Sequence, residues 1–135
     1  MKFFILFILG ILASCSCSCN SLDGEMLKNI PLDNLILSIY ENGRENQIFE
    51  LHLSDKEKAR LMSWLNSFAG SQIDFNTYAP SVILKGQTLK INFLKGRTVI
   101  SYRKKPDQMG TWKQYSRSAT ADDQQIRNWL KDIAQ

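Results

Sequence analysis

Three cysteines lie close together near the start of the chain, at positions 15, 17 and 19. Their thiols could be acylated, pair between chains or bind a metal. A zinc site needs about four ligands, and a Cys-x-Cys pair alone lacks the second half of such a set. All three cysteines precede the predicted folded region, so no disulfide is expected to cross-link it. The residues before Cys15 decide which chemistry applies.

The segment before Cys15 has the three parts of an export signal. Lys2 supplies a positive charge, residues 3–12 are almost entirely apolar, and Ala13-Ser14 supplies small side chains. This order is typical of a secretory signal. The apolar run is much shorter than the ~20 residues of a transmembrane helix. We therefore expect residues 1–14 to be a signal peptide rather than a membrane span.

The tetrapeptide Leu12-Ala13-Ser14-Cys15 matches the lipobox, so the chain resembles a bacterial lipoprotein precursor. The resemblance implies cleavage before Cys15, a diacylglycerol thioether on its sulfur, and an acyl chain such as palmitate on its new amino group. Several acyl chains hold a protein stably on a bilayer. Ser16 stands where many lipoproteins retained in the inner membrane have aspartate. The resemblance therefore implies an anchor in the periplasmic leaflet of the outer membrane.

The composition divides the chain into a signal peptide (residues 1–14), a lipidated cysteine with a flexible tether (15–29), and one globular α+β domain (30–135). The last part is long enough for one modest core but too short for two domains. A flexible tether of ~14 residues would hold the domain about 20 Å from the membrane on average. The protein is thus expected to work close to the bilayer.

The titratable residues do not indicate catalysis. His52 is the one histidine of the chain, and a hydrolase would need a nucleophile and an orienting group beside it. His52 lies on the polar side of an alternating strand, so a solvent-exposed position is enough to explain a histidine there. Asp122 and Asp123 fall in the first turn of a predicted helix, where carboxylates favour the helix dipole. We expect no enzyme, no cofactor and no metal site.

The domain begins with the pattern of a hairpin followed by a helix. Residues 35–40 and 49–53 alternate in apolar character, and Asn42-Gly43 between them is a strong hairpin-turn signal. The sequence Ser54-Asp55-Lys56-Glu57 then has the form of a capping box. We expect a helix over about residues 54–68, with Gly70 at the position of a helix stop.

The second half of the domain has the pattern of a meander closed by a helix. Strands are predicted over residues 82–84, 88–94 and 98–103, because apolar residues alternate there and glycine-containing turns separate them. Residues 111–118 form a candidate edge strand. A final helix is indicated after Thr120 by apolar residues at helical spacing, namely Ile126, Trp129, Leu130 and Ile133.

This order of elements, ββα-βββ(β)-α, predicts an α+β fold. We expect an antiparallel sheet of about five strands with both helices packed on one face. The other face would be open to solvent or to a partner.

Charge is distributed unevenly between the two halves of the domain. Residues 80–135 carry eleven Lys and Arg against four Asp and Glu, whereas residues 20–79 carry five against nine. A basic sheet face would steer an acidic partner protein or anionic lipid headgroups. The alternative is that the lysines line a solvated face and protect the sheet edges from aggregation. A nucleic-acid partner is not expected, because the export signal removes the protein from the cytoplasm.

Aromatic residues lie among the basic ones near the last strand, a composition found at binding hot spots. Packing in the core or at the sheet edge is the alternative role for these aromatics. The partner-facing surface predicted from this composition consists of Trp112, Tyr115, Lys104, Lys105, Lys113 and Arg117.

The sequence therefore predicts an outer-membrane-anchored periplasmic lipoprotein that acts as a non-catalytic protein-binding module. Its partners would be the bilayer, through acylated Cys15, and a protein of acidic character. By analogy of size and location, we favour a toxin-neutralising (immunity-type) role. The alternatives are an accessory or structural envelope lipoprotein of a secretion or outer-membrane complex, and a small ligand- or lipid-binding lipoprotein.

Replacement of Cys15 by serine tests the anchor. The Cys15→Ser variant should lose acylation and remain an uncleaved precursor, because the lipobox selects this thiol. Mass spectrometry of the purified protein measures both changes. Normal diacylglycerol modification of Cys17 or Cys19 in the unaltered protein would contradict the assignment.

Overall fold

One antiparallel sheet and two long helices dominate the computed structural model, which describes residues 20–22, 24–73, 79–106 and 112–135. The strands in chain order are β1 (Asn20–Ser21), β2 (Leu35–Glu41), β3 (Arg44–Leu51), β4 (Ala69–Ile73), β5 (Val82–Lys85), β6 (Leu89–Leu94), β7 (Arg97–Tyr102) and β8 (Lys113–Ser118). The helices are α1 (Gly24–Lys28), α2 (Asp55–Ser67) and α3 (Ala121–Ala134).

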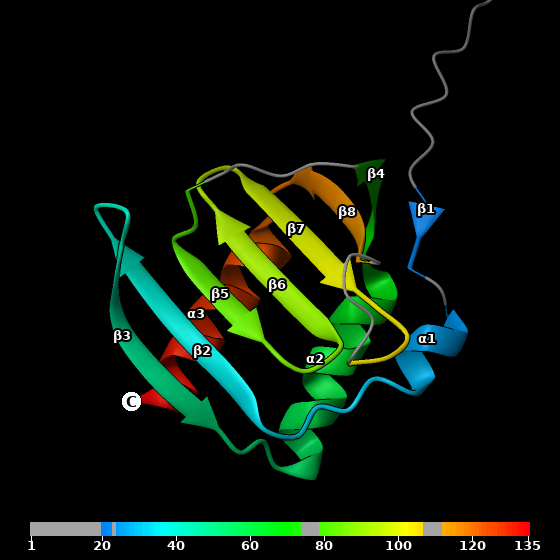
Figure 1. Cartoon of the computed structure of the whole chain (residues 1–135), viewed down its shortest axis with the longest axis horizontal. Helices are drawn as coiled ribbons and strands as arrows, with labels where there is room; N and C mark the ends of the chain where they lie inside the picture. Colours follow the sequence, from blue (N-terminus) through cyan, green and yellow to red (C-terminus); the bar gives the residue numbers. More distant parts are fainter. Residues whose placement is uncertain (1–19, 23, 74–78, 107–111) are drawn as a thin grey trace, which may run out of the picture.

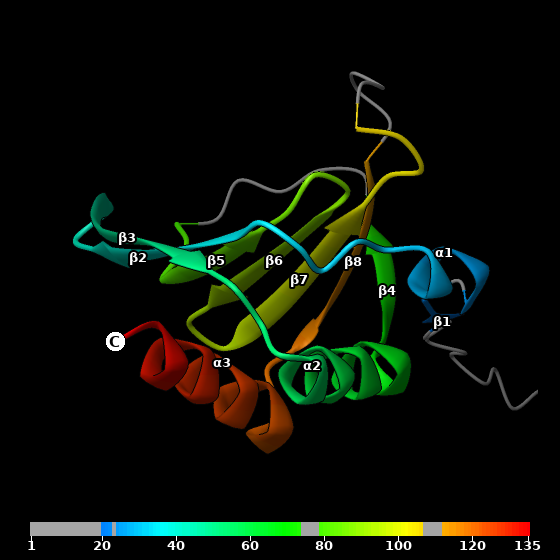
Figure 2. The ribbon, with the colours of Figure 1, turned by 90° about the horizontal axis from the view of Figure 1, so that it is seen from below.

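The strands have the order β1-β4-β8-β7-β6-β5-β2-β3 in the sheet (Figure 1). Seven of them form the main sheet, and the two-residue β1 extends it beyond β4. Helices α2 and α3 lie on the same face (Figure 2). The predicted α+β class and the placement of both helices are confirmed, whereas the expected number of about five strands was too small. None of the described helices is long and apolar enough to cross a membrane.

Strand β4 is the main element that the sequence pattern did not predict. Its residues Ala69–Ile73 show no alternation, and it pairs with β8 far along the chain. A Cβ atom on Gly70 would lie 2.8 Å from the carbonyl oxygen of Ser116. Gly70 is therefore needed for the close approach of β4 to β8, and α2 has already ended at Ser67.

The local turn and capping signals are confirmed. The Ser54 Oγ accepts a hydrogen bond from the Glu57 N–H (3.2 Å), and the Ser54 N–H donates to the Glu57 carboxylate (2.9 Å). Asn42 and Gly43 have φ angles of 51° and 75°, as a tight two-residue hairpin turn requires. These elements form where predicted because their signals lie within a few residues of each other.

The segment before the first long strand is folded, contrary to the expected tether. Leu22, Leu27 and Ile30 are buried in the hydrophobic core, β1 pairs with β4, and α1 contacts α2. The described fold therefore includes residues 20–22 and 24–29, which the sequence assigned to the tether. Only residues 15–19 separate the predicted anchor from this fold. Cys15, Cys17 and Cys19 lie outside the described residues.

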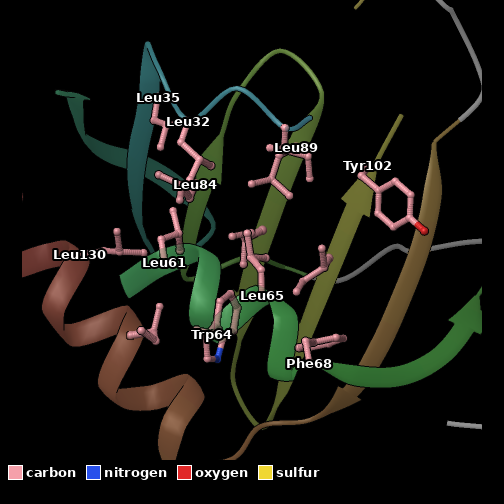
Figure 3. Packing of buried hydrophobic residues seen from close by; sticks show 14 of the residues in the cluster. Leu32, Leu35, Leu61, Trp64, Leu65, Phe68, Leu84, Leu89, Tyr102 and Leu130 are labelled. Atoms are coloured by element: carbon pink, nitrogen blue, oxygen red, sulfur yellow. The ribbon is translucent and has the colours of Figure 1, made fainter. Parts of the chain in front are cut away.

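The core lies between the sheet and the two long helices (Figure 3). From α2, Leu61, Trp64 and Leu65 are buried against the sheet. The Trp64 ring stacks on Phe93 with 5.8 Å between centroids and meets Phe68 edge-on at 6.0 Å. Burial of these large side chains supplies most of the stabilisation of a domain this small.

Trp129 has a smaller part in the core than its helical spacing indicated. It is only half-buried, and it packs at the margin of the core. The Arg60 guanidinium lies 4.6 Å from its ring centroid. Trp64, rather than Trp129, is the tryptophan that joins the helices to the sheet.

Two truncations test this ranking. Leu65→Ala should lower the free energy of unfolding by about 2–5 kcal/mol, because it leaves a cavity under a fully buried side chain. Trp129→Ala should cost less, since part of its ring already contacts solvent. Urea unfolding monitored by circular dichroism measures both. Equal or reversed effects would show that the core is assigned wrongly.

Candidate binding face

The side of the sheet opposite α2 and α3 is called the free face here. Paired residues in an antiparallel sheet lie on the same face. Lys85 pairs with Lys90, Lys90 pairs with Ser101, and Ser101 pairs with Gln114, so these four residues form one row across β5, β6, β7 and β8. Neighbouring residues on each strand, such as Leu84, are buried under the helices.

The free face carries three cations, which lie near the ends of their strands. Strands β5–β8 contain no Asp or Glu, while Lys85, Lys90 and Arg97 lie on their free face. In the described part of the chain, the salt bridges found are Lys58 with Asp33 and Arg117 with Asp123, and neither reaches this face. None of the three cations has a salt-bridge partner among the described residues. The acidic residue of the same row is Glu50 on β3, which pairs with Ile36 beside Lys85.

The middle of the free face is partly covered by side chains. Arg97 donates from Nε and Nη2 to the Oγ of Ser116, at 3.1 Å and 2.6 Å. Ser116, Val99 and Ser101 are buried. A hydroxyl accepts these hydrogen bonds without neutralising the guanidinium, so Arg97 is positioned but keeps its charge.

Trp112 and Arg103 form one wall of this face. Trp112 directly precedes Lys113, and Arg103 directly follows Tyr102. Lys113 and Tyr102 pair with each other on the helix-covered side, so their neighbours lie on the free face. The Arg103 guanidinium lies 4.4 Å from the Trp112 ring centroid, and Arg103 Nε donates to the carbonyl oxygen of Gln87 (3.1 Å). The half-buried indole is thus held at a fixed place.

A cavity of about 250 Å³ opens beside Trp112. Within the described residues, two of its side chains have buried oxygens without a hydrogen-bond partner, Asn92 Oδ1 and Gln114 Oε1. Such atoms are uncommon in folded proteins and call for a ligand or water. We call this cavity the free-face pocket; its lining residues are Pro80, Ile83, Lys90, Asn92, Ser101, Trp112 and Gln114.

Apolar side chains continue the free face toward the β3 edge. Ile36 and Ile48 are the large hydrophobic side chains that stay exposed in the described chain, at 40% and 61%. Ile36 pairs with Lys85, and Ile48 pairs with Ser38. On the same face Ile36 also pairs with Glu50, so exposed apolar and polar side chains alternate toward the β3 edge.

The six residues predicted as one partner-facing surface do not lie together. Tyr115 is 8% exposed and stacks nearly parallel on Tyr102, with 5.7 Å between ring centroids. Arg117 also points to the helix-covered side, where it pairs with Asp123. Alternation along β8 places both side chains on the opposite face from Trp112.

The remaining predicted residues are also divided. Lys104 and Lys105 are exposed in the turn after β7, and Lys113 is exposed on the helix-covered side. Among the six, Trp112 alone lines the free-face pocket. Lys90, Asn92 and Gln114 were not predicted as site residues. The alternation from Trp112 to Gln114 was the signal that could have identified Gln114.

His52 is exposed just beyond the end of β3, as expected for a solvated histidine. It lines a separate hollow of about 280 Å³ together with Glu50 and Asn34. No group of three or more His, Cys, Asp or Glu side chains suited to a metal ion is found in the described ranges.

Asp123 connects the two long helices to the sheet. Its carboxylate accepts hydrogen bonds from Trp64 Nε1 (3.0 Å), Thr98 Oγ1 (2.8 Å) and the Thr120 N–H (3.2 Å). Arg117 donates to both carboxylate oxygens. The Asp123 side chain is 1% exposed, so its charge is compensated by these donors rather than by water.

Comparisons with known proteins identify no family. No protein-family model matches the chain, and no match was found among the curated proteins or the solved structures. The function is therefore inferred from the side chains of the free face.

The lowered pKa of Asp123 provides a test of its contribution to the stability of the fold. Burial alone would raise this pKa, but the hydrogen bonds from Arg117, Thr98, Thr120 and Trp64 outweigh burial and lower it. The ionised Asp123 carboxylate therefore adds to the free energy of unfolding. This contribution is fully present above the ordinary aspartate pKa of about 3.9, and it is lost as pH falls through the lowered pKa of Asp123. Asp123→Asn should cost about 3–5 kcal/mol at neutral pH, since it leaves Arg117 without its anion.

Urea unfolding measured between pH 7 and pH 2.5 checks this effect. The variant should show a weaker fall in stability on the acid side than the unaltered protein. Asp122→Asn is the matched control, because Asp122 is the exposed neighbour on the same helical turn. Equal losses for the two variants would contradict the role given to Asp123.

Proposed function

We propose that the protein is an outer-membrane-anchored lipoprotein that binds an acidic partner protein with the free face of its sheet. The supporting observation is the placement of Lys85, Lys90 and Arg97 on one face of four strands that contain no acidic residue. Such a face speeds the encounter with an acidic surface and selects against basic ones. The exposed Ile36 and Ile48 add apolar area beside it.

The short anchor segment favours a protein over lipid headgroups as the partner of this face. If Cys15 carries the lipid, residues 15–19 can span at most about 17 Å. The folded part then joins the anchor at β1, at one edge of the sheet, and β3 forms the opposite edge (Figure 1). If the domain meets the bilayer with this edge, the cations of the free face stay accessible to a protein from the side.

The free-face pocket is small for a ligand-binding site. Its volume of about 250 Å³ is below the roughly 300–1,000 Å³ typical of small-molecule sites. A pocket of this size suits one side chain of a larger partner.

Within protein binding, we propose a toxin-neutralising role as the more specific function. Fast, electrostatically steered capture suits a protein that must inhibit an incoming acidic toxin domain before it acts. An accessory role in an envelope complex is the competing proposal. A toxin-like reading frame beside the gene would favour the first role, and a secretion or envelope operon the second.

Photo-cross-linking in cells tests the proposed face. A photoreactive amino acid at position 85 should give a cross-linked partner protein, because this residue is exposed on the free face. The same amino acid at position 56 is the control, since Lys56 is exposed on α2. With the captured partner purified, Lys85→Glu should slow association roughly two- to tenfold at low salt, and Lys56→Glu should not.

The salt dependence of the association rate distinguishes a loss of electrostatic steering from a folding defect. The effect of Lys85→Glu should shrink as ionic strength rises, because surface charges are screened beyond about 10 Å at 0.1 M salt. Equal cross-linking from both positions, or equal association rates for both variants, would refute the proposed face.

A further inference from the structure

We infer that the outer edge of β3 binds an extended strand of the partner protein, which then continues the antiparallel sheet. The added strand would carry a basic residue opposite Glu50 and apolar residues opposite Phe49 and Ile48. This inference rests on the proposed function and names how the partner protein is held.

Strand β3 forms one edge of the sheet, and β2 is its paired neighbour in the described chain. It has eight residues, whereas β1 and β4 at the other edge have two and five. Proteins commonly protect long sheet edges with lysine or proline, and β3 contains neither. It is also the edge opposite β1, where the proposed anchor joins the fold (Figure 1). An incoming partner can therefore reach it.

The main-chain groups of Ile48 and Glu50 face away from β2. The Tyr40 N–H donates to the carbonyl oxygen of Ser81, just before β5 (2.9 Å), so the main chain of Tyr40 faces β5. Alternate residues of a strand direct these groups to the same side. The residues two and four positions before Tyr40 therefore also face β5, and they are the partners of Ile48 and Glu50. The N–H and C=O groups of Ile48 and Glu50 consequently point outward.

A bulge confines the regular part of this edge to residues 47–51. The register of β2 and β3 shifts between Ile39 and Tyr40, which leaves Asn46 without an opposite residue, and such a bulge bends the strand. Within the regular part, each of the two outward residues can exchange two hydrogen bonds with an added strand. In strand addition these main-chain bonds give affinity, and the side chains give specificity.

The side chains of β3 specify the added strand. Ile48 is 61% exposed on the free face, and an apolar side chain opposite would cover it. Glu50 is exposed on the same face and is in neither salt bridge found among the described residues, so a basic residue opposite it is favoured. Phe49 is half-buried at the margin of the core, which an apolar neighbour would extend. An antiparallel strand reads basic–apolar–apolar from its N-terminus.

A second copy of β3 fits this edge less well. Two-fold pairing centred on Glu50 puts the two carboxylates opposite each other, and pairing centred on Phe49 puts Ile48 opposite Glu50. Pairing centred on Ile48 extends into the bulge at Asn46. A strand of another protein avoids all three conflicts. Its flanking acidic residues can still approach Lys85, which continues the row of Glu50 across Ile36.

Peptide titration of the full chain, purified in detergent micelles, tests the inference. The probe is acetyl-Thr-Thr-Lys-Val-Val-Thr-Thr-amide, and nitrogen-15 NMR should show saturable shifts of the Ile48 and Glu50 main-chain amides below about 10 mM peptide. Methylation of the two peptide nitrogens that face β3 should weaken binding about tenfold or more, because it removes two hydrogen bonds and keeps the charge. Replacing the peptide lysine by glutamate should weaken binding about two- to fivefold.

Variants of β3 separate strand pairing from a general charge effect. Glu50→Lys should reverse the preference between the lysine and glutamate peptides. Glu45→Lys is the matched control, since Glu45 is an exposed acid on the other side of the bulge. Ile48→Pro should weaken binding about fivefold because it removes an outward N–H and leaves the bonds to β2, whereas Ile48→Val should bind normally. Unchanged signals elsewhere in each spectrum show that the variants are folded.

Four outcomes would overturn the inference. They are no saturable shift, equal binding of the methylated peptide, an unchanged preference in Glu50→Lys, or a dimer of the chain in analytical ultracentrifugation that Ile48→Pro dissociates. Cross-linking at position 85 reports separately on the proposed function. A partner captured there while the β3 amides ignore the peptide would retain the binding face and remove strand addition. Peptide binding at β3 without any partner captured at position 85 would remove the proposed function instead.

Discussion

The buried carboxylate of Asp123 is the interaction on which the arrangement of helices and sheet depends. It accepts hydrogen bonds from Trp64 on α2, from Thr98 on β7 and from both nitrogens of the Arg117 fork on β8. It also caps its own helix through the Thr120 N–H. A charge removed from water is tolerated only where its partners are fixed in place. The position of each of these elements is therefore coupled to the position of the other three.

This ion pair also determines what the free face presents. Arg117 must point toward Asp123, and alternation along β8 then places Ser116, Gln114 and Trp112 on the other side of the sheet. On β8, Arg117 therefore forms its ion pair with Asp123 on the helix-covered side. The cations of β5, β6 and β7 have no such anion on their strands. The ion pair is consequently on one face of the sheet, and the cations of β5, β6 and β7 on which the proposed binding depends are on the other.

The fold was predictable from sequence where its signals are local. The hairpin at Asn42-Gly43 and the capping box at Ser54 each involve residues within one turn, and both formed as predicted. Strand β4 was missed because its pairing with β8 is distant and its residues do not alternate. Asp123 was explained by the helix dipole alone, because Trp64, one of its donors, lies 59 residues earlier. The residues of the predicted surface are divided for a related reason: composition grouped Tyr115 with Trp112, and strand periodicity separates them.

The apolar flank distinguishes the free face from a merely solvated one. Lysines on a sheet face can serve only to keep it soluble, whereas a binding face also offers apolar area to a partner. Ile36 and Ile48 remain exposed on the same face, toward the β3 edge. Burial of apolar area raises the affinity of a complex but does not depend on orientation. Complementary charges instead select the partner and speed its association. The proposed binding role of the free face depends on both kinds of side chain.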